Sequence, residues 1–257
     1  MACSEEVAFP SRREDDVATG KVNVGFLSPI SLDAPHFDRF ERFVPDGVSL
    51  GLRALDLVEG ALTSLQGKED VAAERAIQVI RDNPDWQSAA ILGAPVQVYN
   101  PGMAQKVRAQ VSIPITTALE ASAAALKALG ASRILLMTPF DETLNAQCRD
   151  FLAGYGIQAA SGPQPAAYYR DAEKLGSDDI YRLTAEGMAS AGDVQAVYFQ
   201  GAIFDPLPII GKLEADMKVP IVASNPAMLW HLVALVGGRF SVPNGGKLLE
   251  EWPSLAT

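Results

Sequence analysis

The residues best suited to chemistry lie where predicted strands end. Each is a glycine, an amide or a hydroxyl residue that follows an apolar run: Ser28, Gly93, Thr138, Gln200, Gly201 and Asn225. In open α/β sheets ligands bind beyond the carboxyl ends of the strands, so we expect these residues to contact a substrate. For Ser28, Thr138 and Asn225 the alternative is that the side chain caps the next helix, and for Asn225 capping is the favoured interpretation.

Gly93 and Gly201 each precede a predicted helix start. Backbone N–H groups at such a start have no intrahelical acceptor and can bind a carboxylate. This predicts an anion site at Ala94 and the residues after it, and a second at residues 201–204. Gln200 could orient a carboxylate, although a neutral amide is no general base. The alternatives are ordinary tight turns, where glycine is common, and a glutamine tied to the backbone.

The elements that must position these residues alternate between apolar runs and helical patterns. Strands are expected at residues 22–27, 48–57, 88–92, 113–116, 133–137, 157–160, 196–199 and 219–222. Helices are expected at residues 34–42, 68–82, 100–110, 117–129, 141–153, 178–190 and 202–218, after residue 225, and at the surface of the tail. Alternation of this kind predicts an α/β fold of parallel sheets flanked by helices.

The pattern of residues 91–130 is repeated at residues 198–237. Each stretch reads as a strand end, a glycine turn, a helix, an apolar-Pro-apolar strand and a helix closed by glycine. Two such halves facing each other would place Gly93 and Gly201 on opposite walls of one cleft. The alternative is a chance echo, because βαβ units share these features.

Composition excludes several classes of function. The formal net charge is −10, from 21 basic and 31 acidic residues among 257. No basic cluster offsets this charge, so we expect no nucleic-acid partner. No apolar run approaches the roughly 18 residues of a membrane span. Residues 1–20 are charged, lack the apolar core of a secretory signal and are predicted to be a flexible segment of a cytoplasmic protein.

Several motifs resemble the aspartate/glutamate racemase superfamily, in the branch of maleate isomerases and arylmalonate decarboxylases. They are VGFLSP at residues 24–29, VPDGV at 44–48, ALG at 128–130, MTPF at 137–140 with Asn145, LEA at 213–215, VPIV at 219–222, SNPA at 224–227 and Trp230-His231.

The resemblance implies two pseudo-symmetric Rossmann-like lobes with the active site between them. One lobe would comprise residues 21–116 and 222–257, and the other residues 117–221. The family also implies a homo-oligomer that uses no metal and no organic cofactor.

The sequence departs from the family at the positions that carry its chemistry. Racemases and maleate isomerases of this kind use a cysteine at each of two strand ends, and the decarboxylases keep only the second. Counting back without a gap from residues 219–221 places the second position on Gly201, and taking residues 91–92 as the strand end places the first on Gly93. Both thiols are therefore missing, and a glycine would leave room for substrate or water. Phe140 replaces a tyrosine that would bind a carboxylate, and the asparagine often found after the first strand corresponds to Leu32.

Other groups would then have to carry the proton. His36, in the loop of residues 31–37, and Tyr99 are the candidates, besides water, and a solvated loop histidine is the alternative for His36. We expect an enzyme that acts on a small mono- or dicarboxylate through carbanion or enediolate chemistry, as an isomerase or a decarboxylase. The alternative is a carboxylate-binding or regulatory protein that has lost catalysis.

Overall fold

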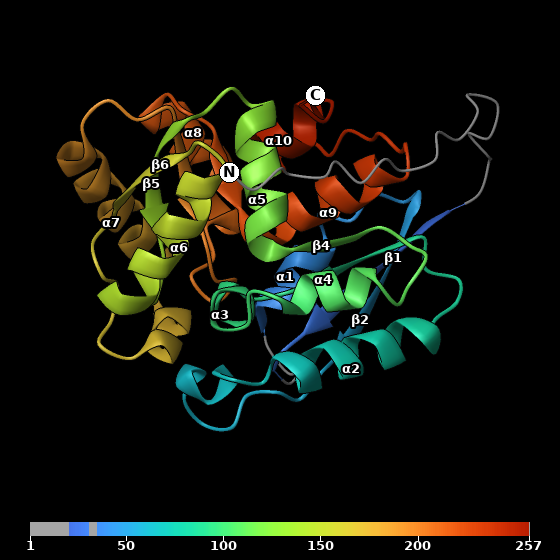
Figure 1. Cartoon of the computed structure of the whole chain (residues 1–257). Helices are drawn as coiled ribbons and strands as arrows, with labels where there is room; N and C mark the ends of the chain where they lie inside the picture. Colours follow the sequence, from blue (N-terminus) through green and yellow to red (C-terminus); the bar gives the residue numbers. More distant parts are fainter. Residues whose placement is uncertain (1–20, 31–34, 257) are drawn as a thin grey trace.

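The protein consists of two parallel four-stranded sheets wrapped in helices, as seen in a computed structural model that describes residues 21–30 and 35–256 (Figure 1). The first sheet has the strand order β2-β1-β3-β4 and the second β6-β5-β7-β8. This is the α/β architecture that the alternating pattern predicted, with two separate sheets.

The elements associated with the first sheet are β1 (Val22–Ser28), α1 (Pro35–Glu41), β2 (Val48–Ala54), η2 (Leu62–Leu65), α2 (Glu69–Arg81), β3 (Ser88–Ile91), α3 (Ala94–Tyr99), α4 (Met103–Arg108) and β4 (Ile115–Thr117). They are followed by α5 (Ala118–Ala128), β5 (Arg133–Met137), α6 (Glu142–Gly154), β6 (Gln158–Ser161), η3 (Tyr169–Lys174), α7 (Ser177–Ala191), β7 (Ala196–Phe199), η4 (Leu207–Ile209), α8 (Ile210–Met217), β8 (Ile221–Ala223), α9 (Ser224–Leu235) and α10 (Gly246–Glu251).

Two helices, α5 and α9, join the sheets. Each begins directly after a short strand, β4 or β8, and the two pack against each other in the middle of the molecule (Figure 1). A capping box starts α5, because the Thr117 hydroxyl accepts from the Glu120 N–H and the Glu120 carboxylate accepts from the Thr117 N–H. Helix α9 also contacts the first sheet, where the Ser88 hydroxyl donates to the Leu232 carbonyl at 3.0 Å.

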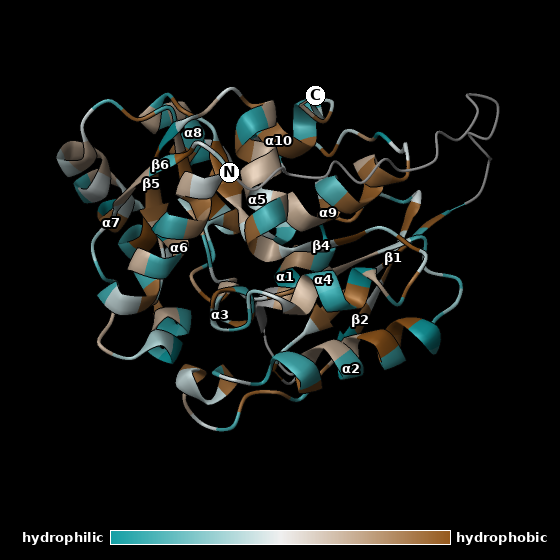
Figure 2. Ribbon diagram, viewed as in Figure 1, coloured by the Kyte–Doolittle hydropathy of each residue, from teal (hydrophilic) through white to brown (hydrophobic). Residues whose placement is uncertain are grey.

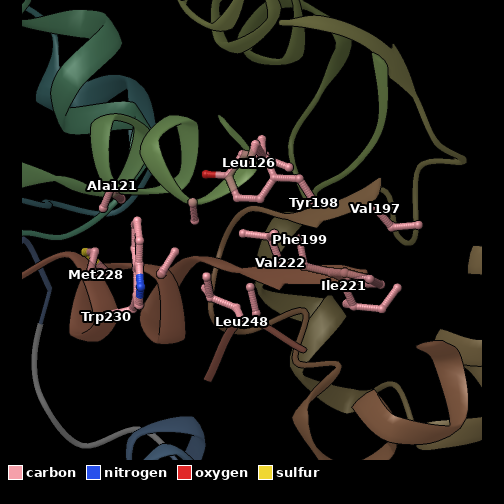
Figure 3. Packing of buried hydrophobic residues seen from close by; sticks show 14 of the residues in the cluster. Ala121, Leu126, Val197, Tyr198, Phe199, Ile221, Val222, Met228, Trp230 and Leu248 are labelled. Carbon is pink, nitrogen blue, oxygen red and sulfur yellow. The ribbon is translucent and has the colours of Figure 1, made fainter. Parts of the chain in front are cut away.

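The apolar core follows from strands buried on both faces. Side chains of β1 alternate between two clusters, with Val24 and Phe26 in the cluster of α1 and α9, and Leu27 in the cluster of α2 and α4. Hydrophilic residues gather along the outer helices, such as α2 and α7 (Figure 2). Near the contact of α5 and α9, Tyr198 reaches from β7 toward α5 (Figure 3).

Two expected helices differ in the structure. Residues 94–108 form two helices separated at Asn100, where one helix was expected from Asn100 onward. The Asn100 amide donates to the Leu65 carbonyl at 3.0 Å and to the Val96 carbonyl at 3.1 Å, so this residue ends α3 and Pro101 does not start a helix.

The helix in the tail was expected at the surface, but it packs into the core. Leu248 and Leu249 of α10 are buried, as is Trp252. Helix α9 is apolar almost all round and therefore needs cover, which the tail provides: the Trp230 indole N–H donates to the Pro253 carbonyl at 2.9 Å. Within the described residues, no helix has the length and apolarity required to cross a bilayer.

Candidate active site

A cavity of about 100 Å³ lies where the carboxyl ends of the two sheets meet. Its lining includes the predicted residues Ser28, Gly93, Phe140, Gln200, Gly201 and Asn225. Most of the remaining lining is apolar: Pro29, Ile30, Phe37, Leu62, Leu65, Leu92, Pro95, Ala202, Ile203 and Met228. Tyr169 and Ser224 complete it, whereas Ala94 and Thr138 lie outside the lining. The polar residues are therefore few and sit at strand ends, and their role in binding stays a prediction.

The two glycine turns correspond to each other in detail. Gly93 and Gly201 both have positive φ angles, 85° and 99°. In each turn the residue before the glycine donates its N–H to a carbonyl at the end of the neighbouring strand. Leu92 donates to the Leu27 carbonyl of β1 and Gln200 donates to the Met137 carbonyl of β5, both at 2.9 Å. The internal echo in the sequence thus corresponds to two equivalent turns that line one cavity.

The glycines do not leave the empty space that the sequence suggested. A Cβ atom on Gly201 would lie 2.9 Å from Pro139 Cδ, and one on Gly93 would lie 3.3 Å from Pro29 Cγ. The positive φ angles add strain for any residue with a Cβ. These positions are glycine because the backbone turns there, and a thiol would point into a proline.

Gln200 is the side chain that crosses from the second sheet to the first. It is 1% exposed, and its amide nitrogen donates to the Tyr198 hydroxyl. In the orientation that satisfies all its neighbours, the Gln200 amide oxygen accepts from the Gly201 and Ala94 N–H groups, each at 3.2 Å. Burial raises the pKa of the Tyr198 hydroxyl, which keeps this group neutral. Gln200 therefore satisfies one N–H group on each wall.

The wall at Ala94 consequently offers less to an anion than the sequence suggested. The Ala94 N–H is taken by Gln200, Pro95 has no N–H, and the Val96 N–H donates to the Gly93 carbonyl at 3.2 Å. The opposite wall differs, because the N–H groups of Ala202 and Ile203 have no acceptor within the described part of the chain.

The hydroxyl residues after β1 and β5 both stabilise their own turns. The Ser28 hydroxyl accepts from the Ile30 N–H at 3.3 Å, and the Thr138 hydroxyl accepts from the Phe140 N–H at 3.1 Å. Thr138 also donates to the Asn145 side chain at 2.5 Å. Thr138 is thus occupied away from the cavity, whereas Ser28 lines it.

Asn225 does not cap a helix, contrary to the favoured interpretation. The N-cap residue of α9 is Ala223, and Asn225 lies inside the first turn. Its side chain has no hydrogen-bond partner within the described residues, although Asn225 is only 5% exposed. The same holds for Ser224, which is 4% exposed, and both residues line the cavity.

The groups predicted to carry the proton lie apart from the cavity or outside the description. Tyr99 is not among the lining residues, and burial raises the pKa of its hydroxyl. His36 belongs to α1, but its side chain lies outside what the structure describes, as do Leu32 and the rest of residues 31–34. Cys148 is buried in α6, and burial raises its pKa to about 12. This cysteine cannot stand in for a family thiol.

Tyr169 is the one lining residue in the described chain whose side chain can act as an acid. The Arg170 guanidinium donates from Nε to the Tyr169 hydroxyl at 2.9 Å and lies 5.6 Å from the ring centroid. Among the described residues no three His, Cys, Asp or Glu side chains gather as a metal site would require.

Comparison with known proteins places this geometry in a family. A sequence model of arylmalonate decarboxylases matches residues 96–249. Arylmalonate decarboxylase of Bordetella bronchiseptica is 26% identical over 161 residues, which cover 60% of this chain and 65% of that protein, just under two thirds of its length.

Solved structures share the fold. A crystal structure of arylmalonate decarboxylase has a TM-score of 0.75 at 21% identity, with 89% of this chain and 99% of that chain covered. The maleate isomerase Iso of Pseudomonas putida S16 has a TM-score of 0.77 at 17% identity, with 90% and 99% covered. The chain belongs to the arylmalonate decarboxylase family, in the maleate isomerase and arylmalonate decarboxylase branch of the aspartate/glutamate racemase superfamily.

Proposed function

We propose that the protein is a cofactor-independent decarboxylase of a small malonate-type acid that carries an aryl or similar apolar substituent. The observation that carries the proposal is the cavity between the two glycine turns, whose walls are apolar except at the strand ends. An apolar ring would fit against Phe37, Leu65 and Met228, while one carboxylate would meet the polar end of the cavity. Membership of the arylmalonate decarboxylase family supports the same class of substrate.

The reaction follows from this arrangement in two steps. The bond between the α-carbon and the second carboxylate breaks, CO₂ leaves, and the bonding electron pair passes into an enediolate on the carboxylate that stays. Backbone N–H groups such as those of Ala202 and Ile203 stabilise the charge that develops there. Apolar walls disfavour the charged leaving carboxylate relative to neutral CO₂, which helps the first step.

The second step is protonation of the α-carbon without a cysteine. Tyr169 is our candidate donor, since it lines the cavity and its hydroxyl is held by Arg170. His36 stays a candidate from the sequence, and water is the third possibility. Tyr99 is less well placed, because it does not line the cavity.

An isomerase of a dicarboxylate is less well supported. Such a reaction keeps both carboxylates, so it needs two polar binding sites. The unbonded polar groups of this cavity lie together near β7 and α9, which suits one carboxylate. A binding protein without turnover remains the second candidate. It is favoured by one observation: the lining consists of amides, hydroxyls and apolar groups, with Tyr169 as the sole acid among the described residues.

Incubation of the purified protein with phenylmalonate tests the proposal. We expect the products CO₂ and phenylacetate, whose formation NMR can monitor. We expect no conversion of maleate to fumarate. Tyr169→Phe should lower kcat with little change in KM, while Tyr168→Phe, at a neighbouring ring that does not line the cavity, should change neither. Thermal stabilisation by phenylmalonate without any product would favour the binding protein instead.

A further inference from the structure

We propose that the substrate carboxylate is seated on the first turn of α9 and the adjacent turn at residues 201–203, with the Asn225 amide as the residue that determines specificity for it. This inference deepens the proposed function and rests on it for the class of ligand. It moves the anion site from the space between the two glycines, where the sequence placed it, to one wall of the cavity.

The space between the glycines is already filled by the protein. The Gln200 amide oxygen lies 3.2 Å from both the Gly201 and the Ala94 N–H groups, and its amide nitrogen is bonded to Tyr198. A carboxylate could enter only by expelling this buried side chain and breaking all three hydrogen bonds. Hydrogen-bond donors that are free without such a rearrangement are therefore better placed to bind the carboxylate.

The start of α9 provides unbonded donors. This helix has 12 residues, and its N-cap residue, Ala223, makes no side-chain capping bond. Of its first three residues, Ser224 and Asn225 carry N–H groups that lack intrahelical acceptors and Pro226 has no N–H, and the helix dipole favours an anion there. Its first turn contains no acidic residue that would supply the negative charge from within the chain.

Asn225 is a second, independent indication of a ligand. Asn225 is only 5% exposed, lines the cavity, and its side chain has no hydrogen-bond partner within the described part of the chain. The amide therefore has its hydrogen-bonding capacity left for a molecule in the cavity that it lines. Ser224 is in the same state beside it, with a hydroxyl that can donate to the same oxygen.

The adjacent turn brings two more donors to the same place. Strands β7 and β8 pair in parallel with Phe199 opposite Ala223, so the residues that follow each strand are neighbours. Ala202 and Ile203, whose N–H groups have no acceptor among the described residues, line the same cavity as Ser224 and Asn225. Asp205 lines the adjoining pocket together with Ala202, Ser224 and Asn225, and its carboxylate is paired with the Arg39 guanidinium at 2.6 Å.

The seat is tested by comparing a carboxylate with its neutral amide. Isothermal titration of the full chain with phenylacetate should show about a 10-fold weaker Kd for Asn225→Ala and about a 100-fold weaker Kd for Asn225→Asp, where a carboxylate faces a carboxylate. Binding of phenylacetamide should change much less in Asn225→Asp. Asn244→Asp, which adds the same charge at an exposed loop, serves as the matched control and should bind as wild type.

Equal phenylacetate affinity in wild type and both Asn225 variants would overturn the seat, as would an equal loss for phenylacetamide. If Asn225→Asp does not fold, Asn225→Ala still tests the seat, because it removes the amide donor and should bind phenylacetate about 10-fold more weakly than wild type does. Failure of the proposed reaction is a separate result: wild type would bind phenylacetate in an Asn225-dependent way and yet leave phenylmalonate intact. Absence of any carboxylate binding by wild type would overturn both.

Discussion

Gln200→Ala is expected to weaken the protein and at the same time to open a new small-molecule site. The substitution removes a fragment equivalent to acetamide, together with the acceptor for the Gly201 and Ala94 N–H groups and the partner of Tyr198. At roughly 0.5–1.5 kcal/mol for each hydrogen bond, and with a cavity left behind, we expect a loss of about 2–4 kcal/mol in unfolding free energy. For a chain of this length that corresponds to a melting temperature lower by roughly 4–16 °C.

Added acetamide should restore much of this loss, because it can rebuild the missing hydrogen bonds. At a concentration tenfold above its Kd, a ligand stabilises the folded state by about 1.4 kcal/mol. Acetate should act in the same way, since both N–H groups on which Gln200 rests then become available to an anion. Differential scanning fluorimetry across a concentration series of each compound measures the effect.

Gln200→Met provides the matched control. Methionine keeps most of the volume and offers neither a donor nor a strong acceptor, so this variant should lose stability and gain nothing from acetamide. The reasoning is wrong if Gln200→Ala melts at the wild-type temperature. It is equally wrong if acetamide raises the melting temperature of wild type and variant by the same amount.

Two further predictions concern the surroundings of the cavity. Arg39→Ala removes the ion pair between α1 and η4 and leaves the buried Asp205 carboxylate without its partner. Because Arg39 is one-third exposed, we expect the free energy of unfolding, measured with urea, to fall by about 1–2 kcal/mol. The loss should be smaller in a variant that also carries Asp205→Asn. Burial lowers the pKa of His231 from 6.5 to about 4, so the unfolded chain binds this proton more readily than the folded chain does. As the pH is lowered from 6.5 to 4, the free energy of unfolding should therefore fall by up to about 1.4 kcal/mol per pH unit. His231→Gln should flatten that part of the pH profile, and an unchanged slope would show that another group causes it.

Much of the fold could be predicted because the strands are buried on both faces. Continuous apolar runs such as residues 133–137 and 196–199 left little choice of element, and both match their strands residue for residue. The prediction was poorer where a tertiary contact decides the outcome. The Asn100 side chain ends one helix by bonding to a carbonyl of η2, and α10 is buried because α9 is apolar almost all round and needs cover. Neither contact can be read from local sequence.

The site could be predicted as a place but not as an arrangement of donors. Strand ends and the internal echo located Gly93 and Gly201 beside one cavity. A shift of one residue in a strand's register turns each side chain to the other face of the sheet. The sequence therefore could not show that the Gln200 side chain crosses to the first sheet while Gly201 turns the backbone. The boundary of α9 posed the same problem, because starting the helix one or two residues earlier changes Asn225 from a cap into an unbonded donor.

These two details together limit the chemistry available at the second strand end. Gly201 cannot carry a reactive side chain without moving Pro139, and the side chain that does cross the cavity is an amide, which neither gives nor takes a proton at neutral pH. The tip of β7 can therefore orient a substrate but cannot protonate a carbanion. Any proton must come from another side of the cavity, where η3 contributes Tyr169. If the enediolate carboxylate rests on α9, a catalytic donor has to lie across the cavity from Asn225, and a cavity without such a donor would bind its acid and leave it unchanged.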